Sequence, residues 1–100
     1  MPSLIVSVSH RLSQDEALRR IQVAIAQAKA QYSDKINDLR ESWNGYVGAF
    51  QVSAMSQQAS GTATVNLSEV TIQIALPLLA SIFKSKIESG LRDELTKILA

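Results

Sequence analysis

His10 is the single histidine of the chain, and histidine is the side chain best suited to proton transfer near neutral pH. One histidine does not make a metal site, and no serine–acid arrangement that would make it a catalytic base is indicated. Asp34 and Asp38 are four residues apart, a spacing at which like charges usually belong to a solvated helix face. We therefore predict that His10 caps or packs at a strand-to-helix junction, and we predict no catalytic residues, metal ligands or cofactor.

The segment around the only tryptophan combines aromatic residues with glycines. Trp43 and Tyr46 alternate with Gly45 and Gly48, but the segment contains neither the GxGxxG nor the Walker pattern of a phosphate-binding loop. The pattern favours a turn followed by a strand, with a glycine where another group packs closely. Trp43 has an amphipathic ring beside a turn and is predicted at the edge of the core, where it could also contact a ligand or partner.

Size and charge limit the classes of protein to which the chain can belong. Its 100 residues predict a single domain (residues 1–100), near the size at which one core becomes stable. A formal net charge of +1 gives no electrostatic basis for binding nucleic acid. The absence of cysteine excludes disulfides and thiolate metal sites. We expect a soluble, cytoplasmic protein.

The sequence predicts neither a leader peptide nor a transmembrane segment. Met1–Val8 lacks a basic region and a small-residue cleavage pattern, so we expect it to belong to the mature protein. Ile74–Phe83 is the longest apolar stretch, and it is broken by Pro77 and Ser81 and is about half as long as a membrane span. An amphipathic helix could still touch a membrane or polymer surface.

The first half of the chain predicts a strand and a helix. Leu4–Val8 is short and rich in β-branched residues, as strands are. Ser13 followed by Glu16 forms a capping box, and apolar residues at three- and four-residue spacing continue the helix to Tyr32. Residues 33–42 fit either an extension of this helix or a loop.

The second half predicts three strands and a closing helix. Tyr46–Val52 alternates as a strand does, Met55–Ser60 is polar and predicted to be a loop, and residues 61–76 form an alternating hairpin. Pro77 suits the first turn of the closing helix, in which Gly90 could allow close packing on the sheet. The apolar positions of this helix are Leu79, Phe83, Ile87, Leu91 and Leu95.

These elements predict an α+β fold. The order β-α-β-β-β-α gives a four-stranded antiparallel sheet with two amphipathic helices packed on one face, which buries every apolar stripe at once. The opposite face, marked by Thr62, Thr64, Thr71 and Gln73, is expected to meet solvent or a second subunit. Either a monomer or a homodimer is compatible with such a face.

Short motifs throughout the chain carry a resemblance to a known family. They are Ser9-His10 and Leu12 before Glu16-Ala17-x-x-Arg20; Trp43-x-Gly45 followed by Phe50; Gly61 before the Val65 strand; Leu76-Pro77 with Leu79; Phe83-Lys84 with Ile87-Glu88; and Leu95–Leu99. In their order and spacing the chain resembles the polyhydroxyalkanoic acid system proteins, small bacterial proteins associated with polyhydroxyalkanoate granule genes. The family is named largely by gene neighbourhood, and the resemblance transfers no catalytic motif.

Three functions are compatible with this resemblance. The first is a non-enzymatic accessory protein of polyhydroxyalkanoate metabolism that binds a granule surface or a granule protein. The second is a small carrier that holds an acyl chain between sheet and helices, lined by Tyr46, Phe50 and Phe83. The third is an enzyme acting on hydroxyacyl substrates with His10 as its base. The residues predicted to contact a ligand or partner are His10, Trp43, Tyr46, Phe50 and Phe83.

Overall fold

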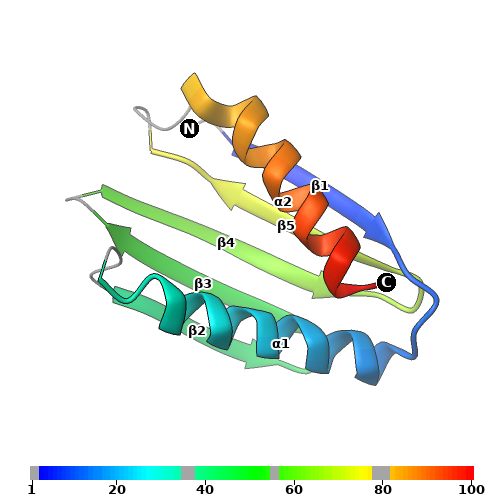
Figure 1. Ribbon diagram of the computed structural model, residues 1–100. Helices are drawn as coiled ribbons and strands as arrows, with labels where there is room; N and C mark the ends of the chain where they lie inside the picture. Colours follow the sequence, from blue (N-terminus) through cyan, green and yellow to red (C-terminus); the bar gives the residue numbers. More distant parts are fainter. Residues whose placement is uncertain (1–2, 35–37, 55–56, 78–81) are drawn as a thin grey trace.

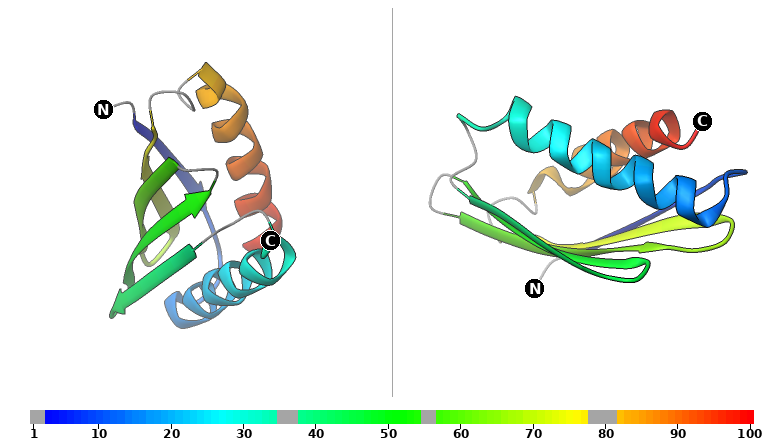
Figure 2. Two further views of the ribbon diagram at one scale, coloured as in Figure 1. Left: turned by 90° about the vertical axis from the view of Figure 1, so that its left-hand side faces the viewer. Right: turned by 90° about the horizontal axis from the view of Figure 1, so that it is seen from below.

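A five-stranded antiparallel sheet with two helices on one face makes up the fold (Figures 1 and 2). The computed structural model describes residues 3–34, 38–54, 57–77 and 82–100. Its elements are β1 (Ser3–Ser9), α1 (Gln14–Gln31), β2 (Asp38–Asn44), β3 (Val47–Ala54), β4 (Gln57–Val65), β5 (Glu69–Ala75) and α2 (Lys84–Ile98). The strand order is β1-β5-β4-β3-β2, so the last four strands form a meander and the first strand pairs with the last.

The α+β class and the placement of both helices on one face are confirmed, but the predicted number of strands is wrong. The additional strand is β2, which lies within and just after the segment left open between helix and loop. Leu39 and Trp43 are the half-buried residues of β2, and its other residues are exposed, so the apolar signal of a strand is weak. Tertiary pairing with β3 therefore decides its conformation. Its charged residues are typical of an edge strand that resists pairing with other chains.

The boundaries of two loops also differ from the prediction. Trp43 lies in β2, and the two-residue turn that follows it is Gly45-Tyr46, where Gly45 has a φ of 61° that glycine adopts without steric cost. Gln57–Ser60 is the first part of β4 and not a loop, because these residues pair with residues 51–54 of β3. Met55 and Ser56 lie outside the described residues.

Helix α1 begins as its sequence predicts, whereas α2 begins later. The Ser13 hydroxyl accepts a hydrogen bond from the Glu16 amide at 3.1 Å, which confirms Ser13 as the N-cap. Pro77 precedes α2 without belonging to it, since α2 starts at Lys84; residues 78–81, which include the predicted helix position Leu79, lie outside the described residues. Gly90 is exposed with open space around it, so the predicted close packing at this glycine is wrong.

The hydrophobic core lies between the helices and one face of the sheet. Helix α2 packs on β1, and α1 lies over the β2–β4 side of the sheet (Figure 1). The buried apolar residues are Leu4, Val6, Ala17, Ile21, Ala63, Val65, Val70, Ile72, Leu76, Leu95 and Leu99.

Arg20 joins the two helices at one end. Its guanidinium Nη1 donates to the backbone oxygens of Ile98 at 3.1 Å and Ala100 at 2.7 Å, and its Nε donates to Glu16 at 3.1 Å. The N-terminal half of α1 is thereby tied to the C-terminus of α2. Away from this end the helix axes diverge (Figures 1 and 2).

Acidification is expected to weaken this helix pair through Glu16. Hydrogen bonds from Arg19 and Arg20 lower the pKa of Glu16 from 4.5 to about 2. Because the folded-state pKa is the lower one, the contribution to stability is complete above pH 4.5 and is lost as the pH falls toward 2. We expect Glu16→Gln to lower the Tm at pH 7 and to reduce the fall in Tm between pH 5 and about pH 2.5. Glu69→Gln, at the exposed first residue of β5, should leave both quantities unchanged in the same circular-dichroism melts. An equal response of the two variants would contradict this role of Glu16.

Candidate functional site

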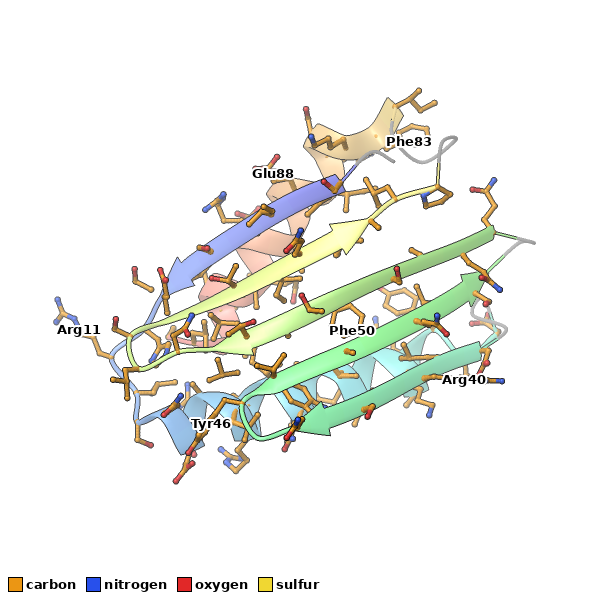
Figure 3. The ribbon with its side chains drawn as sticks, turned by 180° about the vertical axis from the view of Figure 1, so that it is seen from behind. Arg11, Arg40, Tyr46, Phe50, Phe83 and Glu88 are labelled. Carbon is orange, nitrogen blue, oxygen red and sulfur yellow. The ribbon has the colours of Figure 1, made fainter. Side chains whose placement is uncertain are left out.

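The face of the sheet opposite the helices is an ordered array of short side chains, and no helix of the described residues covers it (Figure 3). We call it the outer face. Where all five strands pair, it has three rows with one residue from every strand; Ser9 and Glu69 extend it at one end, and Asp38, Ser53 and Gln58 extend it at the other. The rows are Ser7-Thr71-Thr64-Val47-Asn44, Ile5-Gln73-Thr62-Ala49-Ser42 and Ser3-Ala75-Ser60-Gln51-Arg40.

Uncharged hydrogen-bonding groups dominate the outer face. Among the residues of the three rows, Arg40 alone is charged, and it lies at the margin on edge strand β2 (Figure 3). Beyond the rows, the same face carries Asp38, which pairs with Arg40 at 2.7 Å, and Glu69 at the start of β5. An ordinary solvent-exposed surface is roughly 25–35% charged, so the three rows would be expected to contain several charges. Ser7 and Thr71 share a hydroxyl–hydroxyl hydrogen bond at 2.9 Å across neighbouring strands. The surface is therefore polar, nearly neutral and composed of short side chains.

A shallow groove of about 620 Å³ runs over the outer face. Side chains from two of the three rows line it, among them Arg40, Gln51, Thr62 and Gln73. Its hydroxyl, amide and guanidinium groups can all donate hydrogen bonds, and the one carboxylate of its lining, Glu41, lies on edge strand β2. The groove is thus suited to a ligand or surface that presents acceptors.

A second, smaller space lies between the helices and the inner face of the sheet. We call it the crevice; its volume is about 200 Å³. Its lining is apolar apart from Glu94 and consists of Ile21, Ala24, Ile25, Ala28, Phe50, Ala63, Ile72, Ile74, Leu91, Leu95 and Ile98. The volume is below the roughly 300–1,000 Å³ usual for pockets that enclose a whole small molecule. It suits a short alkyl segment.

His10 lies at the strand-to-helix junction predicted for it. Nδ1 accepts a hydrogen bond from the Leu12 amide at 3.2 Å, so Nε2 carries the proton and donates to the Asn66 carbonyl at 3.1 Å. The His10 amide also donates to the Ser68 carbonyl at 2.8 Å. The side chain is buried and ties this junction to the β4–β5 turn.

The aromatic residues of the β2–β3 hairpin have separate surroundings. The Trp43 indole covers Gly48 on the paired strand and donates to Glu41 at 2.9 Å. The Tyr46 hydroxyl donates to Asp15 at 2.5 Å, and this hydrogen bond raises the pKa of Tyr46 while joining the hairpin to the start of α1. Both rings pack at the edge of the core.

Of the residues predicted to contact a ligand, Phe50 alone lines the crevice. Its ring lies against Gly61 on the paired strand. Phe83 is 56% exposed just before α2, far from Tyr46 at the opposite end of the molecule (Figure 3). The predicted residues therefore do not gather into one site.

The family of the chain is decided by comparison with family models. The model of the polyhydroxyalkanoic acid system proteins matches residues 4–99. The chain belongs to this family.

Comparisons with individual proteins add little to this membership. No curated protein matches the sequence. Among solved structures, the crystal structure of TTHA0849 from Thermus thermophilus has 9% sequence identity and a TM-score of 0.40, over 98% of this chain and 94% of that chain.

Within the described residues, no helix is long and apolar enough to cross a membrane. The same residues contain no cluster of three or more side chains that could hold a metal ion.

The two surfaces differ in how far the sequence indicated them. The Thr/Gln alternation of the hairpin marks part of the outer face of this family member. The β2 positions were missed with that strand, and the outward residues of the predicted third strand were not assigned to this face. The crevice was expected only in general terms. Its lining comes from both helices and the sheet, so it depends on the angle between the helix axes. The residue pattern of a single helix or strand does not encode that angle.

Proposed function

We propose that this protein is a non-enzymatic, cytoplasmic accessory protein of polyhydroxyalkanoate metabolism that binds a granule surface or a granule protein. The observation that carries the proposal is the wide outer face, whose charged residues are confined to its margins. Family membership supplies the biological context.

The distribution of charge over the molecule supports a contact through the sheet. Helices α1 and α2 carry most of the charged residues, whereas the interior of the outer face carries none. Removing a charged side chain from water is expensive, and removing a hydroxyl or amide that finds a new partner is not. The outer face can therefore be covered by a large partner at little desolvation cost.

Co-sedimentation with polyhydroxybutyrate granules tests the proposal. The purified protein is mixed with clean granules and with granules that retain their protein coat, and the pelleted fraction is measured against a centrifuged control without granules. We expect granule-dependent pelleting in at least one case. Binding to neither preparation would contradict the proposed function.

The crevice favours a second candidate function, a carrier for a short acyl chain. An apolar lining on α1, α2 and the sheet would contact an alkyl segment on several sides, and its one carboxylate, Glu94, is on α2. As a carrier, the protein would bind a soluble acyl ligand and not the granule.

Filling the crevice should abolish acyl binding. Ala24→Phe places a ring in the crevice, whereas Ala26→Phe places the same ring on the exposed side of α1. We expect native mass spectrometry with a short-chain 3-hydroxy fatty acid to show one bound ligand for the wild type and Ala26→Phe, and none for Ala24→Phe. A bare polypeptide mass for the wild type, or equal binding by both variants, would rule out the carrier.

A further inference from the structure

We propose that the outer face docks on the polyester itself, with its hydroxyl and amide groups donating hydrogen bonds to ester carbonyl oxygens. The inference rests on the proposed function and names the partner within it. The groove over two rows of the outer face is the centre of the contact.

The chemistry of a polyester matches the composition of the outer face. Its repeating unit has ester oxygens that accept hydrogen bonds and carbon groups that are apolar, and within the chain it has neither charge nor N–H or O–H donors. A protein surface facing it must supply donors and must not bury charges. Thr62, Thr64, Thr71 and Gln73 supply donors, and threonine methyls together with the exposed Ile5 supply apolar contact.

The regular spacing of the array suits a repetitive partner. Neighbouring strands are about 4.8 Å apart, and successive outward residues of one strand are separated by roughly 7 Å. Donors therefore recur at fixed intervals in two directions, as the Ser7–Thr71–Thr64 series shows. Carbonyl groups on an extended polymer chain also recur at fixed intervals, so several hydrogen bonds can form at once.

A protein partner fits the same surface less well. The cores of protein–protein interfaces are enriched in aromatic residues and methionine and depleted in serine and alanine. The three rows contain no aromatic residue or methionine, and serine and alanine recur in them. The composition of the outer face therefore favours the polymer as its partner over a granule protein or a second copy of the chain.

Charge insertion and donor removal test the inference on clean polyhydroxybutyrate particles. Thr62→Lys/Gln73→Lys places two charges in the middle of the array, and Gln22→Lys/Gln27→Lys places the same charges on the exposed side of α1. We expect the outer-face pair to weaken binding by roughly tenfold, because each lysine must leave water, and the α1 pair to bind as the wild type does. Circular dichroism of both variants verifies that the sheet is intact.

A second variant separates hydrogen bonding from simple apolar adsorption. Thr62→Val/Thr71→Val keeps the shape of the surface and makes it more apolar while removing two hydroxyl groups. We expect weaker binding to the polymer; equal or stronger binding would overturn the proposed role of the hydroxyl donors.

The outcomes distinguish the inference from the function on which it rests. If the wild type and the Thr62→Lys/Gln73→Lys variant bind clean particles equally, the outer face is not the contact, although the granule function stands. Binding to coated granules alone would identify a protein partner and overturn the inference. The wild type could elute as a dimer in size-exclusion chromatography and Thr62→Lys/Gln73→Lys as a monomer. That result would assign the outer face to a second copy of the chain and would also overturn the inference. Binding to neither preparation overturns both.

Discussion

Gly61→Ala is expected to lower the free energy of unfolding by about 2 kcal/mol or more, as overpacking in a well-packed interior does. A Cβ atom at this position would lie 2.6 Å from the backbone oxygen of Gln73 and 3.0 Å from the Phe50 ring. The first contact is with backbone of the neighbouring strand β5, which cannot move without disturbing the sheet. Urea unfolding should show a lower midpoint with an unchanged slope.

Gly90→Ala is the matched control, because it adds the same methyl group where nothing lies within 4 Å. Since glycine is the poorer helix former, we expect this variant to raise stability by about 0.5–1 kcal/mol. The same substitution should thus have opposite signs at the two positions. Equal effects would show that the close approach at Gly61 does not constrain the sheet.

Leu95→Ala should be the most destabilising truncation in the helices, at about 3 kcal/mol, because buried leucine-to-alanine changes remove apolar contact and leave a cavity. Leu95 is the largest fully buried side chain of the described residues. It projects from α2 into the core and also lines the crevice. For a domain of this size we expect the Tm to fall by roughly 12–24 °C, which thermal unfolding monitored by circular dichroism would measure.

Leu67→Ala provides the comparison for a leucine outside the core. Leu67 is 78% exposed in the β4–β5 turn, so the same truncation should change the Tm by no more than about 2–4 °C. A small effect of Leu95→Ala would mean that α2 is not held on the sheet by the contacts that the structure shows.

Sequence patterns predicted those elements whose apolar residues are regularly spaced. The β5 alternation of Val70, Ile72 and Ile74 and the Ser13 cap are local signals, and both are confirmed. Strand β2 has two half-buried apolar positions among charged and polar residues, so nothing local distinguishes it from a loop. Its conformation is imposed by pairing with β3, a contact that becomes evident only in three dimensions.

The candidate surfaces were harder to predict than the fold. Aromatic residues and the lone histidine draw attention in a sequence, but His10 and Trp43 are engaged in joining elements of the fold. The outer face consists largely of serine, threonine and glutamine residues that are individually inconspicuous. Their shared environment follows from the register of five strands, which the sequence alone does not fix.

The pairing of β1 with β5 has a consequence for the order in which the molecule folds. Ser7 and Thr71 are hydrogen-bonded although 64 residues separate them, whereas strands β2–β5 follow one another in the sequence with few residues between them. Closing the long loop carries an entropy penalty that the hairpins of the meander avoid. We expect the meander to form first and β1, together with the α2 that rests on it, to join late, so that amide hydrogens of β1 exchange with solvent before those of β4 in native-state exchange experiments.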